Sequence, residues 1–293
     1  MALIDTTKIT LPKEVAQGII NKARDTSVIQ TLSSATPMMF KDMSHILFTK
    51  EPEAEFVGEG KEKGNANAEF KPVAGSIHKA QVTVRLTDEV KWADEDSQIG
   101  IIDAIIDASS AAVGRALDYG VLHAINPATG AAVDGMDALT AGAAVVNATA
   151  DASADLDALV EKVNEDYEVS GVALSKAFAN SLRKIRIKNT GLRMYPEIPL
   201  NLKAGVVDGI AAATSSTVNG KLAATPTKVL AILGDFGLIK WGIVRDLGLE
   251  IIETGDPDGL GDLKRLNQIA YRTEVVYSWA VLDPKGFAVL KSA

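Results

Sequence analysis

The stretch NQIAYRTEVVYSWAVLDPKGFAVLK, residues 267–291, decides the fold. From 269 to 282 its side chains alternate between two faces, one of which carries Ile269, Tyr271, Thr273, Val275, Tyr277, Trp279 and Val281. A period of two with many β-branched and aromatic residues predicts a β-strand. At about 3.3 Å per residue this strand would be about 45 Å long, whereas a common strand has only about 5–6 residues.

The residues from Asp94 to Ala124 predict a helix of similar length. Acidic side chains at 94–96 suit a helix start, because they interact favourably with the helix dipole. Apolar residues then share one face (Ile99, Ile102, Ile106, Val113, Leu117 and Val121), and a polar face carries Asp103, Asp107, Gly114 and Asp118. At 1.5 Å per residue the helix would be roughly 40–45 Å long. Packed together, this helix and the long strand would form an elongated platform.

The first third of the chain predicts two extensions. Residues 1–44 hold a short helical pattern after Pro12 and a second apolar cluster at 28–32, and we expect them to form an arm. The next segment predicts a hairpin with an outgoing strand at 45–57, a charged tip GEGKEKGNAN at 58–67 and a returning strand that ends near Val90. A two-stranded hairpin is marginal in water, so it needs a surface of its own chain or of a neighbour.

Residues 136–244 predict a compact region that mixes helices and strands. A helical stripe at 154–167 is followed by a short strand, GVALS, and a basic helix, KAFANSLRKIRIK. Further strands are predicted at TKVLAILGD (227–235) and LIKWGIVRD (238–246), and LGLEII (247–252) begins the last part of the chain. Because strands and helices do not alternate regularly, the sequence predicts the α+β class.

The composition excludes several classes of protein. The 293 residues carry a net charge of −8 and include no cysteine, so there is no disulfide framework and no cysteine-based metal site. No apolar run approaches the ~18 residues of a membrane span, and the N-terminal residues do not resemble a signal peptide. The acidic balance argues against tight binding of DNA phosphates. We expect a soluble protein made inside the cell.

Catalytic motifs are scarce. His45, His78 and His123 are far apart, with no metal-ligand spacing, and no Ser/His/Asp set can be nominated. The turn GDPDGLGD at 255–262 could hold a hard cation, but it does not match the EF-hand pattern, and a flexible acidic turn is the main interpretation. The basic run SLRKIRIKN at 181–189 could contact phosphates, although on an acidic protein a partner-subunit surface is favoured. We predict no catalysis, no cofactor and no metal.

Six segments, taken in order, resemble the major capsid proteins of tailed bacteriophages. They are LPKEVAQGIINKARDTSVIQTLSSATPM (11–38), EAEFVGEGKEK (53–63), WADEDSQIGIIDAIIDASSAAVGRALDYGVL (92–122), LSKAFANSLRKIRIKNTGLRMYP (174–196), LGDFGLIKWGIVRDLGLEI (233–251) and NQIAYRTEVVYSWAVLDPKGFAVL (267–290). The resemblance implies the Hong Kong 97-like capsid fold. Its parts would be an N-terminal arm (1–44), an extended hairpin loop (45–91), a peripheral domain with a spine helix (92–135), an axial domain (136–244) and the long strands of the peripheral domain (245–293).

The resemblance also implies a function. Pentamers and hexamers of the chain would close into an icosahedral shell around double-stranded DNA, without sequence-specific binding, in the host cytoplasm. Subunit contacts would involve Glu59, Lys61, Lys63 and Gly64 in the hairpin tip and Asp256, Asp258, Asp262, Lys264 and Arg265 in a peripheral loop. We expect solvated lysines in a non-covalent shell, no long prodomain, a separate scaffolding protein and a portal.

Two alternatives stay open at this point. An encapsulin-type nanocompartment would share the fold but enclose a cargo enzyme. An α+β enzyme with an acidic metal site at Asp256–Asp262 belongs to another class, and it predicts a monomer or small oligomer that a metal stabilises.

Overall fold

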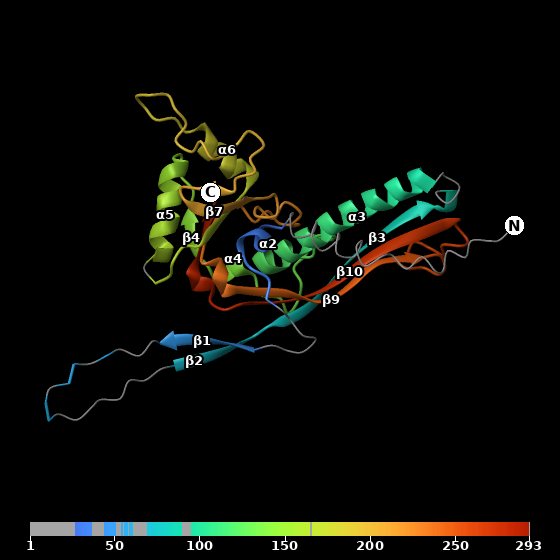
Figure 1. The fold of residues 1–293 in the computed structure, drawn as a ribbon, viewed down its shortest axis with the longest axis horizontal. Coiled ribbons are helices and arrows are strands. Elements are labelled where there is room, and N and C mark those ends of the chain that lie inside the picture. Colours follow the sequence, from blue (N-terminus) through green and yellow to red (C-terminus); the bar gives the residue numbers. More distant parts are fainter. Residues whose placement is uncertain are drawn as a thin grey trace.

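The computed structural model describes residues 27–36, 44–50, 54, 56–57, 59–60, 69–89, 95–164 and 166–292. These residues form an elongated platform, a compact sheet at one end of it and a two-stranded hairpin that leaves the body (Figure 1). The mixture of helices and antiparallel and parallel strands is the predicted α+β class.

The platform consists of strands β3 (Ser76–Thr87), β10 (Gln268–Val281) and β9 (Ile239–Ile252), with helix α3 (Glu95–Asp118) along one face. β10 lies in the middle and pairs antiparallel with both neighbours. At the far end Ile105 of α3 packs against Ile269 and Tyr271 of β10. Figure 1 shows the helix running beside the three strands for most of their length.

The two long elements predicted from the sequence are confirmed. β10 contains 14 residues, and α3 contains 24 residues. The helix continues as a π-helical turn, η3 (Tyr119–His123), and ends at Ala124, whose φ of 53° is left-handed. Apolar periodicity identified both elements, although β10 is buried on both faces over most of its length.

The strand predicted at 238–246 is part of a longer strand, because β9 continues through LGLEII to Ile252. A bulge lies where Glu274 pairs with Gly248 and the next β10 residue pairs with Asp246. Gly248 has a φ of 69°, and its amide donates to Asp246 Oδ1 at 3.0 Å. Gly248 therefore accommodates a bulge, which needs an unusual backbone conformation.

The compact sheet has six strands in the order β4-β11-β8-β5-β7-β6. They are β4 (Ala144–Asn147), β11 (Phe287–Lys291), β8 (Val229–Gly234), β5 (Gly171–Leu174), β7 (Ile210–Thr214) and β6 (Val206–Val207). Helices α5 (Ala152–Asn164) and α6 (Lys176–Lys184) pack on it through buried Leu159 and Phe178. Shorter pieces are α4 (Leu139–Gly142), η4 (Phe236–Leu238) and η5 (Pro284–Gly286).

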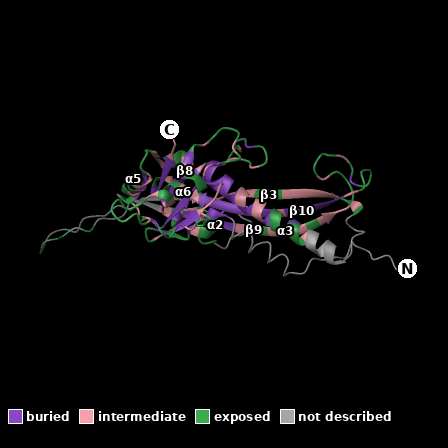
Figure 2. Ribbon diagram, turned by 90° about the horizontal axis from the view of Figure 1, so that it is seen from above, coloured by how far each residue is buried: buried purple, intermediate pink, exposed green. Residues whose placement is uncertain are grey.

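The C-terminal stretch joins the two parts of the molecule. β10 belongs to the platform, and after the η5 turn β11 inserts between β4 and β8 of the compact sheet. Buried residues gather where the two parts meet (Figure 2), and they include Trp241, Trp279 and Phe287. β9 crosses the predicted boundary at 244/245, and the division of the chain into five parts stays a prediction.

The hairpin differs in detail from its prediction. β1 (Ser44–Lys50) pairs antiparallel with β2 (Glu69–Ala74), while β3 pairs with β10 instead of with the outgoing strand. Only Gly75 separates β2 from β3. The returning segment is thus divided in two, because its second half has a longer partner in the platform.

The polar face predicted for α3 is wrong at two positions. Asp103 and Asp107 are exposed, but Gly114 and Asp118 are buried. Asp118 accepts hydrogen bonds from the amides of Val28 (3.1 Å) and Ile29 (3.2 Å) of the short helix α2 (Val28–Leu32). The carboxylate is buried because it binds the segment that covers it.

Candidate functional site

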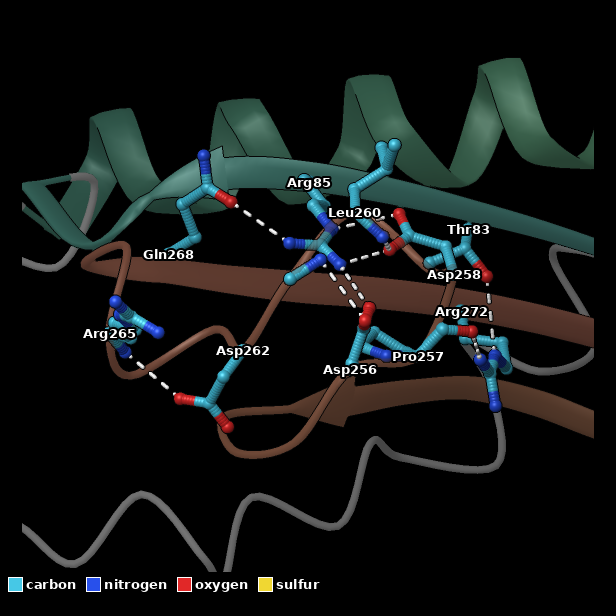
Figure 3. Close-up of polar contacts among 11 residues, drawn as sticks. Thr83, Arg85, Asp256, Pro257, Asp258, Leu260, Asp262, Arg265, Gln268 and Arg272 are labelled. Carbon is cyan, nitrogen blue, oxygen red and sulfur yellow. Dashed lines mark hydrogen bonds and ion pairs between the residues drawn. The ribbon is translucent and has the colours of Figure 1, made fainter.

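The loop between β9 and β10, residues 253–267, is held by an arginine from the opposite edge of the platform (Figure 3). Arg85 of β3 donates from Nε to Asp258 Oδ2 at 2.8 Å and from Nη2 to Asp256 Oδ1 at 2.9 Å. Arg85 Nη2 also bonds Asp258 Oδ1, which makes the contact with Asp258 bidentate. Arg85 Nη1 donates to Gln268 Oε1 at 3.1 Å, so one guanidinium links the loop to two strands.

The same carboxylates shape the loop itself. Asp256 Oδ2 accepts from the amide of Gly261 at 3.1 Å, and Asp258 Oδ1 accepts from the amide of Leu260 at 3.3 Å. Gly255, Gly259 and Gly261 have φ values of 86°, 79° and 103°, in the region that side chains disfavour. The sequence GDPDGLGD therefore forms a compact turn that wraps its acids around Arg85.

A second arginine fixes the neighbouring part of the loop. Arg272 of β10 donates from Nη2 to the Pro257 carbonyl at 2.6 Å and from Nε to Thr83 Oγ1 at 3.2 Å. Leu263 is fully buried, and its carbonyl accepts from the amide of Gln268 at 2.9 Å. These contacts make residues 255–268 a defined surface.

Electrostatics stabilise the ionised form of the cluster. The hydrogen bond from Arg85 is the main cause that holds the pKa of Asp258 below its ordinary value of 3.8. The bond with Asp258 is also the largest cause that raises the pKa of Arg85. The Arg85 side chain is only 10% exposed, whereas that of Asp256 is 40% exposed, so the cluster lies at the protein surface with its cation covered.

The predicted loop residues occupy different roles. Asp256 and Asp258 meet at Arg85, whereas Asp262 caps its own turn by accepting from the amide of Arg265 at 2.9 Å. Lys264 and Arg265 are exposed. The loop also presents exposed Leu260 (71%) and Leu266 (47%). Its outer face is thus a mixture of apolar and charged side chains.

The structure describes only one of the four residues predicted for the contact at the hairpin tip. Glu59 is exposed in a turn, while Lys61, Lys63 and Gly64 lie outside the described residues. Before that turn, Phe56 is 108% exposed and Val57 is 41% exposed. Farther back on β1, Ile46 is 68% exposed. The described part of the hairpin therefore carries apolar side chains that its own chain leaves uncovered.

A pocket of about 570 Å³ lies where the hairpin joins the platform. Its walls come from β3, β10 and the segment after α3, and they include His78, Met136, Tyr277 and Trp279. The His78 ring lies 4.4 Å from the Trp279 ring, and burial lowers the pKa of His78. Among the residues described, no group of three or more His, Asp or Glu side chains could hold a metal.

The metal interpretation of Asp256–Asp262 meets a specific obstacle. A hard cation needs several oxygens that point at one spot. Asp256 and Asp258 instead direct their oxygens at Arg85, and Asp262 faces a backbone amide. The acids of this loop therefore act as partners for an internal cation.

The sequence reasoning missed two residues that hold distant segments together, Arg85 and Asp118. Arg85 looked like any polar residue of an alternating strand, and Asp258 lies 173 positions away. Asp118 looked like part of a solvated helix face. Its partners come from distant parts of the chain, since Ser27 Oγ bonds Oδ1 and Thr217 Oγ1 donates to Oδ2 at 2.6 Å. No local pattern reports such contacts.

Within the described residues, none of the helices has the length and hydropathy to cross a membrane.

No curated protein sequence matches the chain. Solved structures do match. A chain from Mycobacterium phage Ogopogo is 38% identical with a TM-score of 0.82, and the match covers 92% of each chain. A chain from Gordonia phage Cozz is 33% identical with a TM-score of 0.77, covering 92% of this chain and 87% of that one.

A more distant structure, the capsid of an empty GTA particle, is 13% identical with a TM-score of 0.62 and covers 92% of this chain and 90% of that chain. At that identity it supports the Hong Kong 97-like capsid fold alone. The family match and the two phage relatives support a phage capsid over an encapsulin-type shell or an enzyme. Since the model of the phage capsid family matches residues 7–292, the chain belongs to that family and is a major capsid protein, a structural component of the virion.

Proposed function

We propose that the chain assembles through pentamers and hexamers into an icosahedral shell around a double-stranded DNA phage genome. The hairpin carries this proposal, because it leaves the body with Phe56 and Ile46 exposed. Exposed apolar side chains on a projecting arm are typical of contacts between chains. A shell subunit gains from such an arm because it binds a neighbour that its body does not reach.

The loop at 255–268 would supply the second contact. Arg85 and Arg272 fix it from beneath, and exposed Leu260, Lys264 and Arg265 would meet another subunit. Glu59, Lys61, Lys63 and Gly64 would belong to the hairpin contact, and Asp256, Asp258 and Asp262 would order the loop. Surface charges contribute little one by one, but a closed shell repeats each of them many times.

The proposal extends to the particle as a whole. A net charge of −8 suits a container that holds DNA without gripping its phosphates. We expect assembly in the host cytoplasm with a separate scaffolding protein and a portal, and a shell without covalent cross-links.

The hairpin contact is tested by Phe56→Ser, with Val145→Ser as matched control. Both residues are exposed and apolar, but Val145 lies on β4 of the compact sheet. Negative-stain microscopy of the purified chains should show closed particles for the control and few for Phe56→Ser. Equal numbers of particles from both variants would contradict the proposed role of the hairpin in contacts between subunits.

A further inference from the structure

Residues 183–194 form a basic projection on the compact sheet. This segment, RKIRIKNTGLRM, contains Arg183, Lys184, Arg186, Lys188 and Arg193 and no acid. Its hairpin, here called the basic hairpin, spans 185–194 and closes through Ile187 and Leu192, whose amide and carbonyl lie 2.9 Å apart, at a turn that contains Gly191. Figure 1 shows it leaving the body beyond α6.

The neighbouring helix α5 has the opposite charge. Between 151 and 168 the exposed acids among the described residues are Asp151, Asp157, Glu161, Asp166 and Glu168, and the segment holds one base, Lys162. Asp157 and Glu161 are one helical turn apart, so they share a face with Ala154 and Ala158. We call this stripe the acidic face.

The two surfaces do not neutralise each other within one chain. Ser153, at the start of α5, contacts the base of the hairpin, where its Oγ lies 3.0 Å from Tyr195 Oη and 3.9 Å from Met194 Sδ. In the described part of the chain, the ion pairs within 4 Å involve the platform cations Lys79, Arg85 and Arg272. The cations of the basic hairpin are therefore left for a partner.

The side chains around these cations favour a protein partner over a nucleic acid. Ile187, Leu192 and Met194 are 46%, 65% and 46% exposed. Phosphate groups have no apolar surface on which these side chains could pack. The acidic face does, because its small alanines leave room for apolar side chains between the two carboxylates. Opposite charges on two surfaces raise the association rate and fix the register of a contact.

We infer that the basic hairpin of one copy docks on the acidic face of α5 in the next copy around a ring. Because the contact joins two different surfaces, it is heterologous, and a heterologous contact that closes produces a ring. The inference rests on the proposed function, since it names the contact that would hold neighbours within a pentamer or hexamer.

Charge reversal tests the contact in the full-length chain. The variant Arg186→Glu/Lys188→Glu/Arg193→Glu should place about tenfold less protein in rings or shells than the wild type. Sedimentation velocity and negative-stain microscopy at ~50 mM and ~500 mM salt measure this, and salt should weaken the wild-type contact by screening. The thermal unfolding temperature should stay close to that of the wild type, because the hairpin is exposed.

The reciprocal change sharpens the test. Asp157→Lys/Glu161→Lys alone should also lose assembly, whereas a chain with all five substitutions should recover it because the charges are exchanged. Lys176→Glu/Lys221→Glu/Lys285→Glu is the matched control, because it reverses three exposed lysines elsewhere and makes the same change in net charge. This control should assemble like the wild type.

The outcomes separate the contact from the function. Wild-type shells together with equal assembly of both reversed variants would overturn the contact and leave the capsid function standing. A wild-type chain that forms no oligomer at either salt concentration, even with the candidate scaffolding protein added, would contradict both. A DNA duplex that shifts in a gel with the wild type but not with the hairpin variant, while assembly is unchanged, would make the hairpin a DNA surface and overturn the contact.

Discussion

Single residues decide whether the loop at 255–268 is a defined surface. Replacing Arg85 with alanine removes the cation shared by Asp256 and Asp258. We expect faster amide hydrogen exchange at Leu260 and Gly261, whose amides bond those carboxylates, with little change in the unfolding temperature. Arg245→Ala on β9 is the control, because Arg245 is exposed, and it should leave loop exchange unchanged. Equal protection of the loop in both variants would contradict this account of Arg85.

The carboxylate of Asp258 gives a pH signature. Its pKa in the folded chain lies below the ordinary 3.8, mainly because of the hydrogen bond from Arg85. The contribution to stability is thus fully present above about pH 4 and is lost as the pH falls through the depressed pKa. Carbon-detected NMR titration of Asp258 should show this low pKa in the wild type and a value near 3.8 in Arg85→Ala. An unchanged titration would rule out the guanidinium as its cause.

Asp118 should have the opposite effect on the pH dependence of stability, because it should stabilise the folded chain as the pH falls. Burial raises its pKa from 3.8 to about 6, although four hydrogen bonds oppose the shift. Between those values the folded chain binds more protons than the unfolded chain, so this residue favours folding increasingly as the pH falls from about 6 to about 4. The difference amounts to about 3 kcal/mol. Denaturation of Asp118→Asn across that range should lack this slope, and an identical slope in both chains would contradict the assignment.

At the scale of elements, the close approach of η3 to β10 is the most sensitive contact. A Cβ atom on Gly120 would lie 2.9 Å from Trp279 Cη2. Trp279 cannot retreat easily, because it is 5% exposed and stacks on His78. We expect Gly120→Ala to lower the free energy of unfolding by about 1–3 kcal/mol.

The matched control for Gly120→Ala is Gly205→Ala. A Cβ atom there has no atom within 4 Å. Chemical denaturation of both variants compares the two positions. If the two substitutions cost the same, the contact between Gly120 and Trp279 does not limit the packing of the helix end on the strand.

The helices and strands also show which features could be predicted from the sequence and which could not. The lengths of α3 and β10 followed from periodicity, because each element has one apolar face. The continuity of β9 did not follow, because Gly248 serves a bulge that only the partner strand reveals. The residues of the GDPDGLGD turn were identified, but their common partner Arg85 was not, since a contact across 171 residues leaves no local pattern.

For the whole molecule, the platform, hairpin and loop are the parts of a broad subunit, and we propose that its contacts lie at the edges. The compact sheet adds a basic and an acidic surface that are separate in one chain. In an isolated molecule these surfaces have no partner. In an assembly of many copies each of them can bind a neighbouring subunit. The central claim is therefore about assembly.

The most direct test is to express the chain with its candidate scaffolding protein and to examine the particles by sedimentation and electron microscopy. We predict closed icosahedral shells in which rings of five and six subunits can be distinguished. A chain that remained a monomer or a small oligomer with the scaffolding protein present would contradict this prediction.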